Sequence, residues 1–361
     1  MKVKIIVRFL VSLFFIFMSC EKSKNITGTE DNSVINKDVF IQILDSLIYP
    51  LQSASPDYND DDLAPLSYLG NSKIVGLGEA THGSREFFQL KHRIFKYLVV
   101  KHGFKIFGFE CDMGESYYFD RYITEGKGNI DKLMRNKMHF WTWKTEEVKA
   151  LLEWMKLYNE DKSQEEKIHY IGVDCQFFTF QPNLLLEYFT RVKPDFVEEI
   201  TPTLNMIEKM GYTSSSVNAY YSNMEEEETF AISDSLDMIL SQIEAIEDEL
   251  ITHSSDFEYQ FMKQLVRNIQ QVNDEKYMYY HESDYSIRDE YMAENVLWLS
   301  SLANENDGIA VWAHNGHIQN ASILDGNVGY LKSLGYYIKS HIGAQYQIVG
   351  FSFCRGSFMA I

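Results

Sequence analysis

The chain contains 361 residues, of which 45% are hydrophobic and 14% aromatic, so it has enough apolar material for a packed core and is not a disordered chain. Its formal net charge of −19 at pH 7 excludes nucleic-acid binding, which requires clustered cations. Such a charge mainly favours solubility, and it also attracts cationic or amine-bearing small molecules.

The N-terminus has the pattern of a bacterial targeting signal. A basic start is followed by an apolar run, residues 9–18, which is too short for a permanent membrane-spanning helix. Cys20 ends a sequence similar to a relaxed lipoprotein box. We therefore predict a signal peptide over residues 1–19, lipidation of Cys20 and a polar tether over residues 20–36. The protein is expected in the cell envelope, periplasmic or associated with the outer membrane through its lipid anchor. An ordinary signal peptide with an incidental cysteine is the alternative.

The other cysteines do not predict a disulfide framework or a zinc site. Cys111, Cys175 and Cys354 are odd in number, and their spacings match no zinc pattern. Each lies at or near the end of a predicted strand, where a small buried thiol is the common role.

Five short apolar runs predict strands. Each run is almost continuously apolar, which is typical of strands buried on both faces of a parallel sheet. Segments with apolar residues at helical spacing lie between them, clearest over residues 86–101 and 145–159. The strands are expected at residues 73–78, 105–109, 168–173, 308–313 and 347–353.

A long helical segment interrupts this alternation. From residue 183 to about residue 302 the pattern is helical almost throughout. No internal repeat and no Pro-rich or Gly/Ser linker divides the mature chain, so we predict one α/β domain over residues 37–361, with a mainly parallel sheet flanked by helices. The insertion is expected to form a lid over the carboxyl ends of the strands. Four glutamates at residues 225–228 are interpreted as a solvated helix start or loop and not as a metal site.

Polar clusters follow four of the predicted strands directly. In an open α/β sheet, ligands bind outside the carboxyl ends of the strands. Because parallel strands end at the same edge, two histidine sites and three carboxylate sites are expected in one crevice. Four clusters at equivalent positions are hard to explain by core packing alone. They are Glu79 with His82, Glu110-Cys111-Asp112, Asp174-Cys175-Gln176 and His314-Asn315-Gly316-His317.

These clusters belong to a set of motifs that covers roughly residues 40–361. The set consists of Gly78-Glu79-Ala80-Thr81-His82-Gly83 with Arg85-Glu86-Phe87, Gly108-Phe109-Glu110, Trp141 through Trp154-Met155 with Asn159, Gly172-Val173-Asp174-Cys175-Gln176, Arg288-Asp289 with Met292-Ala293 and Asn295, and Trp312-Ala313-His314-Asn315-Gly316-His317-Ile318. In this order the motifs resemble the erythromycin esterase family. The resemblance implies a hydrolase without metal or cofactor that acts on a macrolide lactone or another ester, and it suggests macrolide resistance. Relatives of this fold include haem-binding lipoproteins and metal-dependent proteases.

Ester hydrolysis of this type assigns a role to each cluster. Water is a poor nucleophile at neutral pH, so we assign His82 as the general base, a role worth about 10²–10⁴-fold in rate. Glu79 and Glu110 are expected to orient His82 and to favour its protonated form. His314 is expected either to hold the water or to protonate the leaving alkoxide. The alternative for His82 is a structural loop histidine bonded to the backbone. The alternative for Glu79 and Glu110 is a buried structural carboxylate.

One family position differs in this chain. The resemblance implies a catalytic arginine nine residues after the histidine, where this chain has Lys91. We expect Lys91 to supply a catalytic cation for the developing oxyanion. A lysine keeps the positive charge of the arginine but lacks the two parallel N–H donors of a guanidinium. For Arg85 and Arg288 a structural ion pair is the alternative role. The expected substrate-binding residues are Arg85, Glu86, Asp174, Gln176, Arg288 and His317.

Rival functions remain open at this point. The sequence has no Gly-x-Ser-x-Gly, His-Glu-x-x-His or phosphate-loop motif, which disfavours a serine esterase, a zincin and a nucleotide-binding protein. A metal-dependent hydrolase would use Glu79, His82, Glu110 and His314 as ligands. A haem-binding lipoprotein would need an accessible axial ligand such as histidine.

Overall fold

The computed structural model describes residues 3–6, 42, 45–210, 214–284, 286–325, 329–353 and 358. Most of the predicted signal peptide, the tether with Cys20, and Cys354 lie outside these residues. Near the start of the chain, β1 (Val3–Ile6) pairs with β2 (Ile48–Leu51) in an antiparallel arrangement. Among the described residues, no helix combines the length and the apolar character that crossing a membrane requires.

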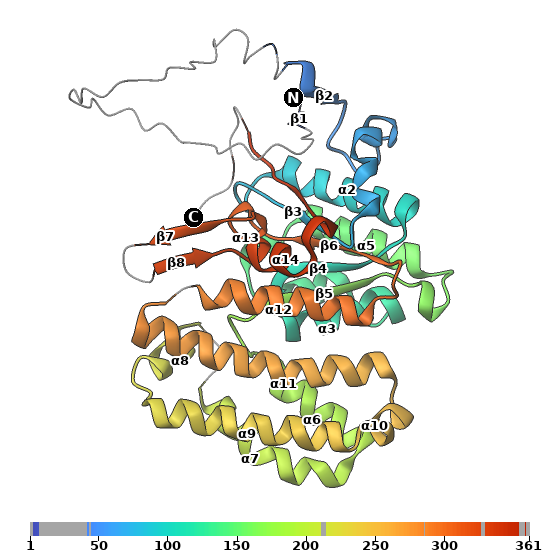
Figure 1. Cartoon of the computed structure of the whole chain (residues 1–361). Coiled ribbons are helices and arrows are strands. Elements are labelled where there is room, and N and C mark those ends of the chain that lie inside the picture. Colours follow the sequence, from blue (N-terminus) through green and yellow to red (C-terminus); the bar gives the residue numbers. More distant parts are fainter. Residues whose placement is uncertain are drawn as a thin grey trace, which may run out of the picture.

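The five predicted strands form one sheet with the order β5-β4-β6-β3-β9 (Figure 1). Every neighbouring pair in this sheet is parallel, as expected. Strands that are distant in the chain are therefore neighbours in the sheet, and their carboxyl ends share one edge. The strands are β3 (Ile74–Leu77), β4 (Phe104–Asp112), β5 (His169–Asp174), β6 (Gly308–Trp312) and β9 (Tyr346–Val349).

Two strands end three or more residues away from the predicted end. β4 continues to Asp112. Its register against β5 shifts between Phe109 and Asp112, and such an irregularity changes the direction of the side chains that follow it. β9 ends at Val349, although a strand was expected as far as residue 353. The chain leaves the sheet there because the side chain of Asn315 bonds both main-chain groups of Phe351, with its Nδ2 2.6 Å from the carbonyl and its Oδ1 3.2 Å from the N–H.

Both helices predicted in the first half of the chain are present. α2 (Arg85–His102) ends at Gly103, whose φ of 73° lies in the left-handed region that glycine favours at helix ends. α5 (Glu146–Asn159) begins at Thr145, whose hydroxyl accepts the N–H of Val148 at 3.2 Å.

The sheet is buried on both faces, which explains its almost continuous apolar strands. Adjacent residues of a strand point to opposite faces, and Ile74 and Val75 accordingly belong to two different hydrophobic clusters. The cluster with Val75 includes residues of α2 and α5. The cluster with Ile74 includes residues of α12 and α14. The remaining elements outside the insertion are η1 (Asp61–Asn71), α3 (Met113–Glu125), α4 (Ile130–Asn136), η2 (Trp141–Trp143), η3 (Gln164–Glu166), α13 (Asn315–Ile318), β7 (Ser322–Asp325), β8 (Gly329–Lys332), α14 (Leu334–Ile342) and η6 (Gly343–Gln345).

The helical insertion is present, but its placement corrects the prediction of a lid. Its apolar residues join the hydrophobic cluster on one face of the sheet, and Figure 1 shows α6, α7, α9 and α11 as a layer beyond α12. The insertion lies along this face because its apolar stripes can be buried there. The four glutamates at residues 225–228 are exposed and begin α9, as interpreted. The insertion consists of α6 (Gln181–Val192), η4 (Pro194–Phe196), α7 (Val197–Lys209), α8 (Ser214–Tyr221), α9 (Glu226–Ala245), α10 (Glu247–His253), α11 (Asp256–Tyr277), η5 (Met278–Glu282) and α12 (Ile287–Leu302).

The two described cysteines are buried free thiols, as predicted. Cys111 lies near the end of β4 and Cys175 directly follows β5. Burial raises the pKa of both thiols well above the usual value, so neither is a reactive thiolate at neutral pH.

Asn159 joins three parts of the core at the start of β5. Its side chain is buried, and its Nδ2 donates to the carbonyls of Ile123 at 3.2 Å and Ile168 at 2.8 Å. Its Oδ1 accepts the N–H of Ile168 at 2.8 Å. One amide thus satisfies main-chain groups from the end of α3 and from the residue that precedes the edge strand.

We expect Asn159→Ala to lower the free energy of unfolding by about 2–4 kcal/mol, because it leaves buried main-chain groups without partners. Urea unfolding followed by circular dichroism measures this change. Asn223→Ala is the matched control, since Asn223 is exposed although its amide also donates to a main-chain carbonyl, that of Ala219. The control should change stability by less than about 0.5 kcal/mol. Equal losses in the two variants would contradict this account of Asn159.

Candidate active site

A pocket of about 380 Å³ lies at the carboxyl ends of the strands, a size that suits a small molecule. Four predicted clusters and two further segments contribute to its wall. Seven of the predicted site residues line it: His82, Glu110, Asp174, Gln176, Arg288, His314 and His317. The other lining residues are Thr81, Phe140, Thr142 and Trp143. The sheet therefore brings together most of the predicted site.

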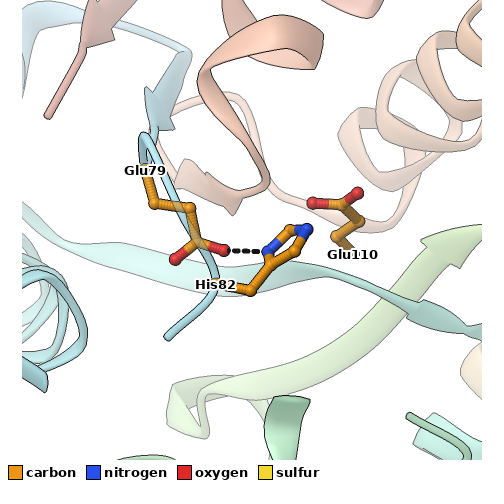
Figure 2. A group of neighbouring side chains, drawn as sticks. All are labelled: Glu79, His82 and Glu110. Atoms are coloured by element: carbon orange, nitrogen blue, oxygen red, sulfur yellow. Dashed lines mark hydrogen bonds and ion pairs between the residues drawn. The ribbon is translucent and has the colours of Figure 1, made fainter. Parts of the chain in front are cut away.

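Glu79 and His82 form the contact that the sequence predicted after β3. Glu79 is fully buried, and its Oε1 lies 2.6 Å from Nδ1 of His82 (Figure 2). Its Oε2 accepts from Nζ of Lys91 at 2.7 Å and from Nε1 of Trp312 at 3.2 Å. One carboxylate oxygen thus faces the histidine, while the other is held by two donors from behind.

His82 lies between this buried carboxylate and the open pocket, with its side chain 37% exposed. Its ring lies edge-on to Trp143, with centroids 5.1 Å apart, and 5.5 Å from the ring of His314. Although burial acts in the opposite direction, the hydrogen bond with Glu79 and the charges of Glu110 and Glu79 raise the pKa of His82 above its ordinary value. These contacts favour a histidine that binds a proton readily.

Lys91 lies behind Glu79 and not in the pocket wall. It is fully buried, with its Nζ 4.2 Å from the centroid of the Trp312 ring. Burial lowers the pKa of Lys91 to about 8, although Glu79 acts in the opposite direction. This position does not fit the predicted contact with a substrate oxyanion. The ammonium group is instead used to compensate a carboxylate that is buried without water contact.

Glu110 connects three other parts of the site. Its Oε2 accepts the backbone N–H of His314 at 2.7 Å. Its Oε1 lies 3.2 Å from Nε2 of His317 and 3.3 Å from Nη2 of Arg288. Although burial acts in the opposite direction, His317 and Arg288 hold the pKa of Glu110 well below its usual range. Glu110 is therefore a carboxylate at neutral pH.

Arg288 forms a bidentate ion pair with Asp174. Its Nε donates to Oδ1 at 2.9 Å and its Nη2 to Oδ2 at 2.8 Å. Gln176 donates to the same Oδ2 at 2.7 Å. Although burial acts against it, Arg288 holds the pKa of Asp174 below its usual value. The structural ion pair that was the alternative for Arg288 is therefore present, at the pocket wall.

The two histidines after β6 have different surroundings. Nδ1 of His314 accepts the N–H of Gly316 at 3.1 Å, so a neutral His314 carries its proton on Nε2. Nδ1 of His317 is in close contact with Oδ1 of Asp289. Although burial opposes it, Glu110 and Asp289 raise the pKa of His317 to about 10. His317 is thus an imidazolium at neutral pH, whereas His314 offers an N–H donor.

Arg85 and Glu86 lie outside the pocket, which corrects their predicted role in substrate binding. The exposed Arg85 pairs through Nε with Oε1 of Glu147, 3.0 Å away. Glu86 is half-buried on the first turn of α2 and does not line the pocket. Both residues lie on the first turn of α2, which begins at Arg85.

Residues that the prediction missed form one wall of the pocket. Phe140, Thr142 and Trp143 belong to the short segment around η2, between α4 and α5. Thr142 and Trp143 lie within the quoted motif that begins at Trp141, but a single turn has no periodic pattern from which a role in the site could be predicted. Asp289 was also missed as a partner of His317, although it is adjacent to Arg288 in a quoted motif.

One group among the described residues has the arrangement of a possible metal site. Glu79, His82 and Glu110 each offer one ligand atom, and these atoms lie within 4.8 Å of one another. Both carboxylates are already paired with cationic side chains, Glu79 with Lys91 and Glu110 with Arg288 and His317. Such compensation reduces the charge available to a divalent ion, so the donor set fits a metal poorly.

The chain was compared with known proteins. A family model described as erythromycin esterase matches residues 99–361. Erythromycin esterase type II of Escherichia coli is 28% identical over 326 residues, which covers 86% of this chain and 76% of that protein. The putative hydrolase YbfO of Bacillus subtilis is 27% identical over 281 residues, which covers 70% of this chain and 57% of that protein.

Solved structures agree with this similarity. A protein of Bacillus cereus has a TM-score of 0.75 at 27% identity, covering 87% of this chain and 74% of its own. A succinoglycan biosynthesis protein has a TM-score of 0.74 at 26% identity, covering 88% and 75%. The erythromycin esterase mutant EreC, in its open conformation, shares the fold, with a TM-score of 0.64 at 18% identity and coverage of 82% and 74%. Because the family model spans most of its length, the chain belongs to the erythromycin esterase family.

Proposed function

We propose that this protein is a carboxylic ester hydrolase of the erythromycin esterase type, in which His82 activates water. The observation that carries the proposal is the position of His82. Its Nδ1 faces the buried carboxylate of Glu79 at 2.6 Å. Figure 2 shows the rest of the ring directed toward Glu110, which is a residue of the pocket wall. This is the arrangement of a general base that is oriented by a second group.

In the proposed first step, His82 acts in its neutral form. With Nδ1–H donating to Glu79, the lone pair of Nε2 is free to accept a proton from a water molecule in the pocket. The resulting hydroxide oxygen bonds to the ester carbonyl carbon, and the carbonyl π electrons move to oxygen. Glu79 and Glu110 stabilise the imidazolium that forms, because both carboxylates favour the protonated ring.

In the second step the ester bond breaks. The tetrahedral intermediate collapses, its carbon–oxygen bond to the alcohol part is lost, and the leaving oxygen takes a proton. Nε2–H of His314 is the proposed donor, since Nδ1 of that ring is occupied by the N–H of Gly316. The proton that His82 took from water then passes to Nε2 of His314, so that both rings return to their neutral forms. The net reaction adds one water and yields a carboxylic acid and an alcohol.

The substrate is proposed to be a small-molecule ester or macrolide lactone. A macrolide is suggested by the names of the Escherichia coli relatives, erythromycin esterases type I and type II. The aromatic side chains of Phe140 and Trp143 offer a wall for an apolar substrate surface. Incubation of the purified protein with erythromycin, followed by mass spectrometry for the gain of one water, tests macrolide hydrolysis and a role in resistance. A panel of simple esters tests the wider class.

We also propose that the protein is lipid-anchored through Cys20 in the bacterial cell envelope. The support is the basic start, the short apolar run and the lipoprotein-like box around Cys20. Loss of membrane association in the variant Cys20→Ala tests this proposal.

The variant His82→Gln should lose about 10²–10⁴-fold in kcat, because it removes the base and keeps a side chain of similar size. The measurement is hydrolysis of whichever ester the wild type cleaves, with circular dichroism to verify the fold. His253→Gln is the control, since His253 is an exposed histidine of α10 that bonds a backbone carbonyl, that of Glu249. Wild-type rates in His82→Gln would remove the proposal.

The pH dependence should also report on His82. A protonated imidazole cannot accept a proton, so kcat/KM should fall as the pH is lowered through the pKa of His82. Because that pKa is raised in the folded protein, the acidic limb should lie above about pH 6.5, the ordinary value for histidine. Glu110→Gln removes one of the charges that raise it and should move the limb to lower pH. An acidic limb well below pH 6.5 in the wild type is incompatible with this assignment.

A metal-dependent hydrolase is the second candidate, favoured by the closeness of Glu79, His82 and Glu110. The esterase proposal expects full activity after dialysis against a strong chelator, and no metal in proportion to protein by elemental analysis. Activity that is lost in chelator and restored by a divalent cation would favour the metal-dependent alternative.

A further inference from the structure

Asp289 is a carboxylate in contact with His317, a residue of the pocket wall, and the proposed reaction does not use it. It lies on the first turn of α12, next to Arg288, with its side chain 16% exposed. Its two oxygens have different partners. Oδ1 is in close contact with Nδ1 of His317, and Oδ2 accepts the N–H of Leu334 at 3.0 Å, at the start of α14. Asp289 thus contacts a site histidine and the helix behind it at once.

His317 extends this contact toward the reacting groups. Its Nε2 lies 3.2 Å from Oε1 of Glu110 on β4. Nη1 of Arg288 lies 3.1 Å from the same Nε2, which can accept this N–H only when the ring of His317 is neutral. Asp289 and Arg288 from α12 and Glu110 from β4 are therefore the charged groups that face this ring. When the ring is protonated, only the two carboxylates among them can accept its two N–H groups.

We propose that Asp289 is a positioning residue of the active site, which fixes the ring of His317 so that its Nε2–H holds Oε1 of Glu110 beside His82. The side chains form a continuous path from α12 through α13 to β4. Asp289 takes the Nδ1–H of His317, and this leaves Nε2–H directed at Glu110. Glu110 in turn favours the protonated form of His82. For its kinetic readout, this inference rests on the proposed function.

The rival account gives Asp289 a structural role only, as the acceptor that begins α14. Glu290 separates the two accounts because it is the next residue on the same helix. Its Oε2 accepts the hydroxyl of Tyr337 at 3.0 Å, so it also joins α12 to α14, but it does not line the pocket. Both residues are carboxylates and both contact α14. They differ in the contact with His317.

The experiment compares Asp289→Asn with Glu290→Gln. Asparagine keeps the size of the side chain and an acceptor for the N–H of Leu334, but its amide cannot accept the Nδ1–H of His317 as a carboxylate does. We expect kcat/KM to fall about 10–100-fold, the size expected for loss of one charge-assisted hydrogen bond. The acidic limb should move to higher pH, because a neutral His317 no longer offsets the charge of Glu110, which raises the pKa of His82. Glu290→Gln should leave the rate and the pH profile unchanged. Asp289→Glu, which retains the charge, should recover part of the rate and the wild-type limb.

A second readout does not depend on ester hydrolysis. Nuclear magnetic resonance can follow the ring signals of His317, which are assigned by their loss in His317→Gln. Near pH 8 these signals should show an imidazolium in the wild type and a neutral ring in Asp289→Asn. If the wild type proves not to be an esterase, the proposed function fails while this spectrum still tests Asp289. If Asp289→Asn does not fold, the spectrum of the wild type is compared with that of Asp289→Glu. The longer side chain displaces the carboxylate and should shift the His317 signals. The control Glu290→Asp should leave these signals unchanged.

The inference is overturned if Asp289→Asn leaves the pH profile and the His317 signals as in the wild type. It is also overturned if Asp289→Asn and Glu290→Gln change both measurements alike.

Discussion

The candidate site depends on the burial of a carboxylate, that of Glu79. A carboxylate without water contact is costly unless cationic and hydrogen-bonding groups compensate it. Here the compensation comes from Lys91 on α2, from Trp312 at the end of β6 and from His82. His82 and Lys91 follow Glu79 closely in the chain, but Trp312 lies 233 residues away. Glu79 is therefore satisfied only when the strand order β6-β3 and the packing of α2 are correct. The same contacts direct His82 toward the pocket, and the stability of the core and the geometry of the proposed base are therefore linked.

A second constraint is the edge strand β5, whose outer main-chain groups need partners. Amide side chains from the insertion supply two of them. Asn295 donates to the carbonyl of Val173 at 3.0 Å, and Asn268 donates to the carbonyl of Asp174 at 3.1 Å. Apolar stripes bury the insertion against the sheet, but these directional hydrogen bonds fix its position along β5. In this position the first turn of α12, with Arg288, lies at the end of β5.

The strands and the polar clusters after them were predictable because both are local patterns. A buried parallel strand is a short apolar run, and a polar residue that ends such a run lies at the functional edge of the sheet. Lys91 was predicted in the wrong surroundings for the opposite reason, and for the same reason the sequence left two roles open for Arg85, of which the structure has the ion pair. A charged residue of a helix has the same local pattern whether it meets a substrate, a buried carboxylate such as Glu79 or a surface partner such as Glu147.

The sequence by itself determined the five parallel strands, the helical insertion, the family and the four polar clusters at the sheet edge. Only the tertiary structure decided that the insertion covers a face of the sheet, that Lys91 supports Glu79 from behind, and that Asp289 holds His317. The physical reason is that strand formation and strand-end chemistry depend on neighbours in the chain. The partner of a buried charge depends on desolvation and on contacts between residues such as Glu110 and Arg288, which the fold alone brings together.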